Sequence, residues 1–448
     1  MSTKIYQPEI KVEKVSIENF RGFANLELEF QPDVTVLIGE NGSGKTAILD
    51  CLASLLVVFQ EHMQKNKFDL KKLLALSDIK QGKFGTNNVI KLQINKLPIS
   101  YQISLNIQNS KQFYDFNVKL SPETRNSIQI SKSIQFQQNA PSDISYIRDI
   151  INPLGSRYNN AVNLVLFVYY PTGNAPINTI DFKNASDNFA TNIFTAYEGA
   201  LDKTSFDFIN FFNWYKWQEN IERQIGTNKV LDTVREAIYN ILSDKQHQFN
   251  KLSINWLNNP NGEMLICKDE IPLNINQLSS GEKTLLALVA DLARRLAIAN
   301  PHRENPLEGN GVVLIDEVDL HLHPRWQRAL IPQLQKTFPN CQLIVTTHST
   351  LVLSNISHKN VIVLEDFQAV KITPNTYGRD NNSILYELMG VKQRPDEMQQ
   401  RLDKVYELID DEKLPEAKEL QTKLLEILGP NDPDIVYLNS LFNFIEGE

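Results

Sequence analysis

The sequence has few of the features that would place it in a membrane or outside the cell. Its three cysteines, Cys51, Cys267 and Cys341, are odd in number and set in apolar stretches, so we expect buried free thiols rather than a disulfide or a metal site. No apolar run approaches the roughly 20 residues that span a bilayer. The opening residues also lack the apolar core of a signal peptide. These absences predict a cytoplasmic protein with no membrane partner.

Positive charge is also scarce. The formal net charge of −8 argues against nonspecific coating of nucleic acid, although a local basic face could still bind phosphates. The best lysine cluster, formed by Lys65, Lys67, Lys71 and Lys72, is more typical of a solvated helix face. No heptad repeat extends across the interval between residues 46 and 278, which argues against a long coiled coil there.

What the sequence does contain is a glycine-rich loop between an apolar run at 34–38 and a helix-like stretch at 47–59. Residues 39–46 read Gly-Glu-Asn-Gly-Ser-Gly-Lys-Thr and match the pattern G-x-x-x-x-G-K-[ST]. In such a loop backbone N–H groups face phosphates, Lys45 would face the β- and γ-phosphates, and the Thr46 hydroxyl would ligate Mg²⁺. A glycine-rich turn without a ligand is the alternative. The motif predicts ATP and Mg²⁺ as ligands, with the nucleotide held by Gly39, Asn41, Gly42, Ser43, Gly44, Lys45 and Thr46.

Two further apolar strands end in polar side chains. The run at 311–315 is followed by Asp316 and Glu317, which places both carboxylates at the carboxyl end of a strand, where open α/β sheets bind ligands. Asp316 would hold Mg²⁺ directly or through water, and Glu317 would polarise the attacking water. The next strand ends at His348, which could reach a γ-phosphate or that water. Carboxylates that cap a buried strand, and a merely structural histidine, are the alternatives.

The order of the phosphate loop, Leu278-Ser-Ser-Gly-Glu282, Asp-Glu and Thr-His-Ser resembles the ABC-type ATPases of the SMC/RecF/OLD group. The opening stretch at 17–23 resembles that group's N-F-R-x-F strand and marks Arg21 as a nucleotide-site candidate. The resemblance implies that two heads sandwich two ATP molecules, with Ser279 and Gly281 contacting the γ-phosphate held by the other head. Asp319 lies in the turn that crosses to the partner in such heads. An ordinary N-cap before an amphipathic helix is the alternative for the Leu278 motif.

A wider resemblance covers most of the chain. It is to the PtuA ATPases of the Septu and retron-linked anti-phage defence systems, and it implies a separate HNH nuclease, PtuB-like, as partner. One departure concerns the strand 164–170, which ends where ABC-type ATPases usually place a γ-phosphate-sensing glutamine; here Pro171-Thr-Gly-Asn174 follows, and its role is unassigned. The stretches that carry this resemblance are residues 167–171, 197–201, 211–214, 305–309, 319–326 and 377–385.

The pattern along the chain predicts an α/β fold, and the resemblance implies that this fold is an ABC-type (SMC/RecF-like) P-loop ATPase head. At 448 residues and 42% hydrophobic composition, the chain can bury a large core and form more than one lobe. The aromatic residues at 206–217 are typical of a helical core rather than of a base-stacking platform. We expect four regions: an N-terminal ATPase lobe with the phosphate loop and an antiparallel β insert (1–175), a helical lobe (176–270), a C-terminal ATPase lobe (271–375), and a three-helix docking or assembly tail (376–448).

The first functional hypothesis is a Mg²⁺-dependent ATP-hydrolysing switch that dimerises head to head on ATP and regulates a partner nuclease in anti-phage defence. A higher oligomer, and nucleic acid contacted through the complex, are compatible with it. A DNA-repair type of ATP-dependent clamp or scaffold acting on DNA ends is the alternative. A transporter ATPase subunit is less favoured because the N-terminal strand and the β insert are unlike transporter heads.

Two further side-chain groups could suggest other chemistry. His321 and His323 beside Asp319 could ligate a transition metal, but the resemblance assigns this turn to the head interface. Fewer than a hundred residues follow Ser349, and their acidic pairs sit near predicted helix ends, where carboxylates often cap. We therefore expect no intrinsic nuclease activity.

Overall fold

The computed structural model describes residues 10–64, 99–107, 115–124, 127–132, 163–172, 192–202, 208–257, 259–370, 375–390 and 393–447. Contacts divide the chain into two compact units, Met1–Arg379 and Asp380–Glu448, and each is described by itself. The lysine cluster at 65–72 and the strand expected at 89–94 lie outside the described residues. The lobe boundaries expected near residues 175 and 270 remain predictions.

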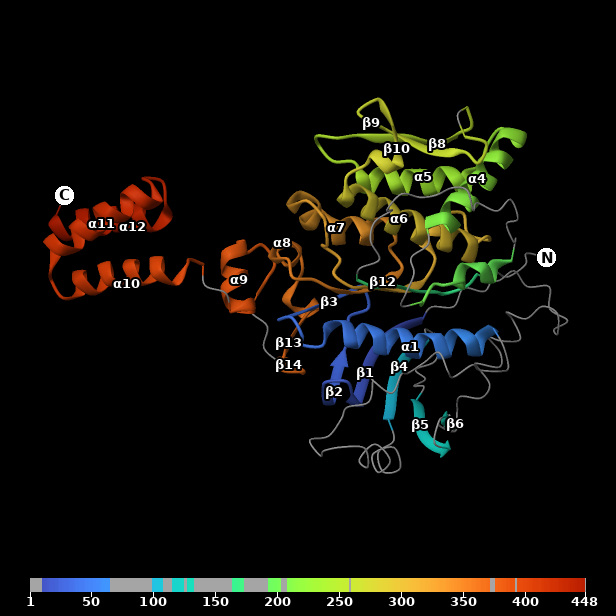
Figure 1. Ribbon diagram of the computed structural model, residues 1–448, viewed down its shortest axis with the longest axis horizontal. Coiled ribbons are helices and arrows are strands. Elements are labelled where there is room, and N and C mark those ends of the chain that lie inside the picture. The colour runs from blue at the N-terminus through green and yellow to red at the C-terminus, as the bar shows by residue number, and fades with distance from the viewer. Residues whose placement is uncertain are drawn as a thin grey trace. The chain divides into compact units, whose positions relative to one another are not determined.

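A six-stranded sheet, in the order β14-β13-β3-β12-β11-β7, forms the centre of the first unit (Figure 1). All of its strands except β14 run parallel to their neighbours, which brings their carboxyl ends to one edge. The strands β7, β11 and β12 are buried along their whole length, because both faces of a parallel sheet are covered. The strands are β3 (Val34–Gly39), β7 (Leu166–Tyr170), β11 (Gly311–Ile315), β12 (Cys341–Thr346), β13 (Val361–Glu365) and β14 (Gln368–Val370).

Helices cover this sheet on both faces. Figure 1 shows α1 (Lys45–Gln64) and α6 (Ser280–Ala299) on opposite sides of it, and both helices contact β7. Both are long runs rich in Ala and Leu, which favour helix and leave apolar side chains to bury against the strands. The shorter α7 (Pro324–Thr337) and α8 (Thr350–Leu353) contact each other, and the 3₁₀ turns are η4 (Ile193–Tyr197), η5 (Ile275–Gln277), η6 (Pro306–Glu308) and η7 (His358–Asn360).

A second, antiparallel sheet has the order β2-β1-β4-β5-β6. The expected alternation is present where β1 pairs with β2, since Val15 faces Leu28 and Ile17 faces Leu26, and all four are buried. Gln342 on β12 ties the two sheets together, because its amide donates to the carbonyl of Val12 and its oxygen accepts from the Val12 N–H, both at 2.8 Å. The strands are β1 (Ile10–Phe20), β2 (Phe23–Glu29), β4 (Ile99–Ile107), β5 (Asp115–Thr124) and β6 (Ser127–Lys132).

The aromatic stretch forms a helical core, as expected. Phe211, Phe212, Trp214 and Tyr215 on α4 (Phe208–Ile225) are each at most 1% exposed, which leaves no open stacking surface there. Helix α5 (Lys229–Leu242) follows, and then a three-stranded antiparallel sheet of β8 (Phe249–Asn255), β9 (Glu263–Lys268) and β10 (Ile271–Asn274).

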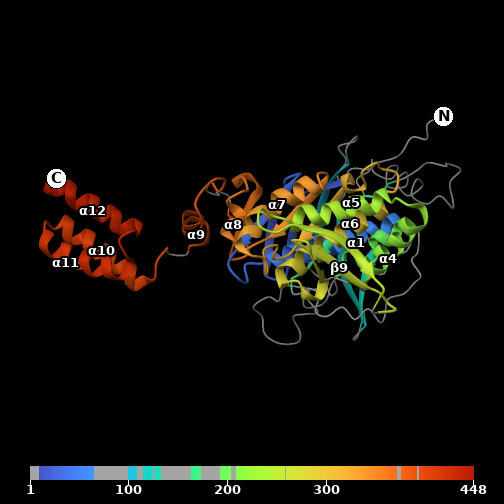
Figure 2. The same cartoon turned by 90° about the horizontal axis from the view of Figure 1, so that it is seen from above.

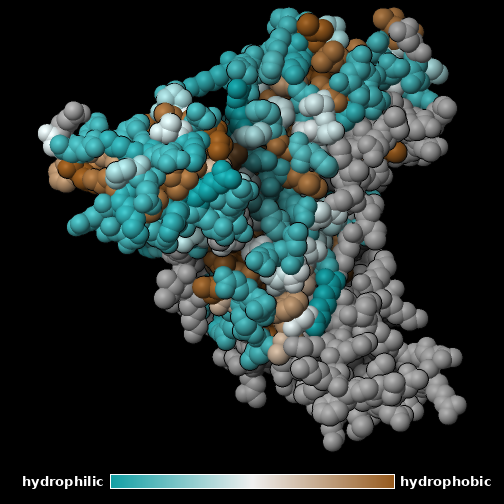
Figure 3. Space-filling view, turned by 60° about the vertical axis from the view of Figure 1, so that its left-hand side comes forward, coloured by the Kyte–Doolittle hydropathy of each residue, from teal (hydrophilic) through white to brown (hydrophobic). Residues whose placement is uncertain are grey.

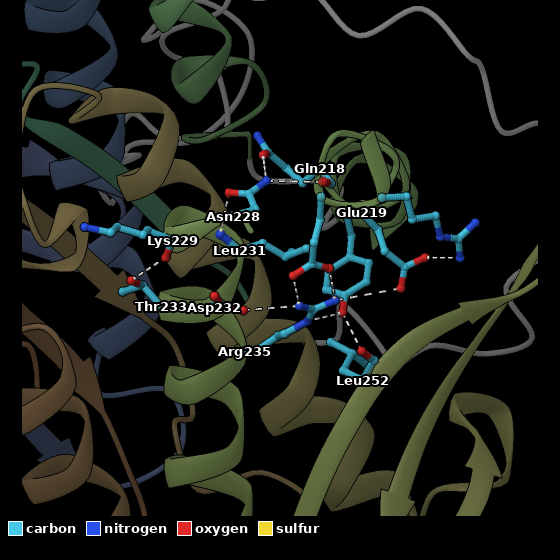
Figure 4. Close-up of polar contacts among 12 residues, drawn as sticks. Gln218, Glu219, Asn228, Lys229, Leu231, Asp232, Thr233, Arg235 and Leu252 are labelled. Atoms are coloured by element: carbon cyan, nitrogen blue, oxygen red, sulfur yellow. Dashed lines mark hydrogen bonds and ion pairs between the residues drawn. The ribbon is translucent and has the colours of Figure 1, made fainter. Parts of the chain in front are cut away.

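A polar network joins α4, α5 and β8 (Figure 4). Arg235 on α5 donates to both carboxylate oxygens of Glu222 at 2.8 and 3.0 Å and to the hydroxyl of Tyr215 at 2.7 Å. Tyr215 in turn donates to the carbonyl of Leu252, and Glu219 accepts from the N–H of Ile254. Charge-assisted bonds of this kind hold helices and strand as one block. That block precedes α6 along the chain.

The second unit is helical. The expected three-helix tail is present as α10 (Asp396–Asp410), α11 (Leu414–Leu428) and α12 (Pro433–Glu446), preceded by α9 (Asn381–Met389). The three helices lie side by side (Figure 2) and bury Val405, Leu424, Leu438 and Phe442 among themselves. The unit therefore has a core of its own.

Two expectations from composition can now be compared with the structure. All three cysteines are free, and Cys51 and Cys341 are buried, whereas Cys267 on β9 of the three-stranded sheet is only half-buried. Among the described helices, none is both long and apolar enough to cross a bilayer. The face drawn in Figure 3 is mostly hydrophilic and carries separate hydrophobic patches.

Candidate functional site

The glycine-rich loop lies between the end of β3 and the start of α1, as the motif predicts. Gly44 has φ 103°, a backbone conformation that L side chains rarely adopt, and a Cβ there would lie 2.3 Å from the ring of Phe23. Phe23 and Phe367 meet edge to face at 5.3 Å between ring centroids. The two rings thus leave no space for a side chain at position 44, so only glycine fits there.

Lys45 lies inside the loop. Its Nζ donates to the carbonyls of Gly39 at 2.8 Å and Glu40 at 2.9 Å. Burial lowers the pKa of Lys45 below its usual value, and the nearby carboxylates of Asp316 and Glu317 oppose that shift. The loop therefore holds a buried ammonium group close to two acidic side chains. Of the other loop residues, Asn41 and Gly42 are exposed.

The carboxylate of Asp316 accepts hydrogen bonds from three hydroxyl groups. Thr46 at the start of α1 donates to its Oδ2 at 2.8 Å, and Thr172, just after β7, donates to the same oxygen. Thr346 at the end of β12 donates to Oδ1 at 2.6 Å. The parallel strands make this possible, because β7, β11 and β12 all end at the same edge. Residues that are far apart in the sequence thus share one carboxylate.

Glu317 follows in a left-handed backbone conformation, with φ 50°. Such a conformation is uncommon for a residue other than glycine and persists where neighbouring groups hold it. Its N–H donates to the Thr346 hydroxyl at 2.7 Å. The turn directs the side chains of Asp316 and Glu317 differently, and Glu317 is the more exposed of the two.

The next polar residues lie around the end of β12. Thr347 donates to the carboxylate of Asp319, and Ser349 donates to Gln327 at 2.8 Å. His348 is exposed at the same edge of the sheet. His323 caps α7 by accepting from the N–H of Arg325, and no group of three or more candidate metal ligands occurs within the described ranges.

The Leu278 motif begins α6. Ser279 is the N-cap and forms a capping box with Glu282, which confirms the helix-start expectation. Lys268 on β9 donates to the carboxylate of Glu282 at 2.7 Å. Gly281 is buried, and a Cβ there would lie 2.7 Å from the carbonyl of His321. The motif is therefore packed against the turn that follows the two carboxylates, with Ser279 exposed.

Arg21 is placed beside α1. Its guanidinium contacts Asp50 at 2.7 Å, and the same carboxylate accepts from the Tyr169 hydroxyl at 3.1 Å. Arg21 has φ 47° in the tight turn between β1 and β2. The predicted nucleotide role of Arg21 stays a prediction.

The residues at this edge suit a nucleotide and Mg²⁺. Hydroxyl and carboxylate oxygens from Thr46, Thr172 and Asp316 are the hard donors that Mg²⁺ prefers. The Ser43 hydroxyl is buried beside the loop and finds no hydrogen-bond partner among the described residues, as expected of a group that awaits a ligand. The loop surrounds Lys45 with backbone rather than with bulky side chains.

Sequence reasoning missed two residues of this site, Thr172 and Thr346. Thr346 lies directly before the Thr-His-Ser motif, so its position at a strand end was a signal that could have been read. Thr172 lies in the segment that replaces the expected glutamine, and only its contact with Asp316 reveals it.

Comparison with known proteins places the chain in a family. Residues 34–354 match the model described as "AAA domain, putative AbiEii toxin, Type IV TA system". The chain is 29% identical to "Retron Ec83 probable ATPase" of Escherichia coli, over 96% of this chain and 86% of that protein. It is 27% identical to "Retron Vc95 probable ATPase" of Vibrio cholerae, over 86% and 80%.

A more distant match is to "Septu protein PtuA" of Bacillus mycoides, at 30% identity over 34% of this chain and 22% of that protein. The family match spans the phosphate loop, the Leu278 motif, the paired carboxylates and His348. The chain belongs to this AAA-domain family.

Proposed function

We propose that this protein is a Mg²⁺-dependent ATPase switch that closes head to head on ATP and controls a partner nuclease in a cytoplasmic defence system. The hydrogen bond from Thr46 to Asp316 carries the proposal. It joins the predicted metal ligand of the phosphate loop to the predicted metal ligand after β11 across 270 residues of sequence. Two such groups are what a P-loop ATPase needs to bind Mg²⁺ with the nucleotide.

Each site residue then has a role. The loop N–H groups and Lys45 hold the phosphates, and Thr46 and Asp316 hold Mg²⁺, whose charge supports phosphoryl transfer. Glu317 orients and deprotonates the attacking water, and His348, exposed at the same edge, contacts the γ-phosphate or that water. These groups lie at the start of α1 or directly after β11 and β12, and such positions beside regular elements favour precise positioning.

Head-to-head pairing is proposed because, in the ATPases that this chain resembles, the motif corresponding to Leu278–Glu282 contacts the nucleotide of the other head. Ser279 is exposed at the N-terminus of α6, where a helix dipole and free N–H groups attract an anion. Asp319 would help form the same interface. The γ-phosphate of the ATP bound to one head would thus be contacted by the Leu278 motif of the other head.

The defence role is supported by the relatives, which carry the names of retron ATPases and of a Septu protein. The nuclease partner is what the resemblance to the PtuA ATPases implies. The unit that follows the head consists of helices with a closed apolar core. We propose that it serves docking or assembly and that the nuclease activity belongs to a separate HNH protein.

The test is ATP hydrolysis by the purified chain with Mg²⁺, alone and with the product of any HNH nuclease gene found next to its own. Turnover that is lost in Lys45→Ala, together with partner DNA cleavage that changes with nucleotide, would support the switch. Turnover stimulated by DNA ends without any partner would favour the DNA-repair type of clamp instead. DNA cleavage by the chain alone would contradict the assignment of the nuclease to a partner.

A further inference from the structure

We propose that the hydroxyl of Thr172 supplies a further oxygen, beside Thr46 and Asp316, to the site of the nucleotide-bound Mg²⁺. This inference rests on the proposed ATPase function and assigns a residue that the sequence left without a role. Its starting observation is that Thr172 and Thr46 both donate to Oδ2 of Asp316. Because both hydroxyl groups donate to the same carboxylate oxygen, the two hydroxyl groups lie close to each other.

The position of Thr172 is fixed by strand pairing. Tyr170, the last residue of β7, lies opposite Ile315 in the parallel register, and its carbonyl accepts from the Asp316 N–H at 2.9 Å. Thr172 follows two residues later and therefore lies next to Asp316. A group two residues beyond the end of a paired strand is held more precisely than one in the middle of a long free loop.

Strand β7 is also held in place by buried charged residues of α6. The Tyr170 hydroxyl donates to Asp291 on α6 at 3.0 Å, and Arg295 holds the same carboxylate oxygen at 2.6 Å. Arg295 also donates to the carbonyls of Ala196 and Glu198. Tyr170, Asp291 and Arg295 are each less than 9% exposed, so this end of β7 is firmly held against α6.

The chemistry of Thr172 suits a place beside Mg²⁺. In a phosphate loop the Thr46 hydroxyl turns its oxygen to the metal, and a hydroxyl within reach of the same carboxylate oxygen can supply another oxygen or hold a metal-bound water. Thr172 is exposed toward solvent, so it remains accessible when a nucleotide binds. We therefore expect Thr172 to affect metal-dependent nucleotide binding and not binding of the nucleotide alone.

The test compares Thr172→Val, which keeps the shape and removes the hydroxyl, with Thr172→Ser, which keeps the hydroxyl. A fluorescent ATP analogue is titrated into each full-length protein without metal and at increasing Mg²⁺. The matched control is Thr233→Val, because the Thr233 hydroxyl bonds to the carbonyl of Lys229 far from the site (Figure 4).

We expect Thr172→Val to bind the analogue normally without metal and to need roughly ten- to a hundredfold more Mg²⁺ for full binding, the usual effect of losing a group that supports a metal. Thr172→Ser and Thr233→Val should match the wild type. An unchanged Mg²⁺ requirement in Thr172→Val would overturn this proposal alone. A wild type that binds no nucleotide at any Mg²⁺ concentration would overturn the ATPase function, and this proposal with it.

Discussion

The hydroxyl of Thr346 donates to Oδ1 of Asp316 at 2.6 Å and accepts the N–H of Glu317 at 2.7 Å. A single buried side chain, 0% exposed, thus holds both acidic residues that follow β11. The two bonds fix the Asp316 carboxylate and support the left-handed backbone at Glu317. Thr346 does not itself carry a metal or a proton in the proposed mechanism, so it is a positioning residue.

The first prediction concerns this pair of bonds. Thr346→Val removes the hydroxyl and leaves the Asp316 carboxylate and the Glu317 N–H each short of one hydrogen bond. Hydrogen bonds to charged groups contribute about 1.5–3 kcal/mol, so kcat should fall roughly ten- to a hundredfold, with a smaller change in KM. Steady-state ATPase assays measure both, and Thr346→Ser should restore most of kcat. Equal kcat in the Val and Ser variants would show that the hydroxyl does not position the site.

The second prediction separates binding from hydrolysis. Lys45→Ala removes the cation that faces the β- and γ-phosphates, so nucleotide binding should be lost. Glu317→Gln keeps the shape and removes the base, so ATP should still bind and should trap a closed pair of heads. Equilibrium nucleotide binding and mass measurements with ATP check both. If Glu317→Gln hydrolyses ATP at the wild-type rate, Glu317 is not the residue that activates the attacking water.

The third prediction tests whether the site is shared between heads. Lys45→Ala and Ser279→Arg should each lack ATPase activity alone, and their mixture should regain part of it. In a mixed pair one site takes its phosphate loop from the Ser279→Arg chain and its Leu278 motif from the Lys45→Ala chain, so that site is intact. If mixed dimers form and no activity returns, each head hydrolyses ATP alone.

The fourth prediction concerns the buried charges on α6. Burial alone would raise the pKa of Asp291, but the charges of Arg295 and Arg294 and their hydrogen bonds outweigh it and lower the pKa below its usual 3.8. A lowered carboxylate pKa stabilises the fold above the unfolded-state pKa, and this contribution is lost as pH falls through the folded-state value.

Asp291→Asn leaves two buried guanidinium groups without their counter-charge and should cost about 3–5 kcal/mol near neutral pH. The deficit relative to wild type should begin to shrink as the pH drops below about 4, where Asp291 protonates in the unfolded chain, and should shrink further as the pH falls through the lower folded-state pKa. Thermal unfolding of both proteins across this pH range measures the difference. Asp403→Asn, at an exposed position, is the control. A deficit that is the same at every pH would contradict the ionic origin.

The fifth prediction concerns the second unit. Ending the chain at Arg379 removes α9 to α12 and retains the hydrogen bonds from Thr376 and Gly378 to the first unit. The shortened chain should keep nucleotide binding, because the helices have their own core. It should lose assembly or partner binding, since apolar side chains such as Tyr437 and Phe444 are exposed on that unit. Oligomer mass, partner pull-down and nucleotide binding test this. Retained assembly with lost ATP binding would show that the helices belong to the catalytic fold.

The sequence was most informative where a motif is local. The loop around Lys45 was predictable because glycines that permit unusual φ values must stand next to each other in the chain. The helix start at Ser279 was predictable for the same reason, since the capping box joins residues three apart. The α/β class followed from apolar runs of strand length that alternate with amphipathic helices.

The sequence alone determined which residues could bind phosphate, and where the acidic pair Asp316 and Glu317 would end a strand. Only the tertiary structure decided that Thr172 and Thr346 meet at Asp316, that Arg21 pairs with Asp50, and that Gln342 joins the two sheets. The physical reason is that the spacing of apolar residues in the sequence encodes each helix and strand, but not which helices and strands pack against one another. Which side chains meet depends on strand order and register, and these arise from packing between segments far apart in the chain.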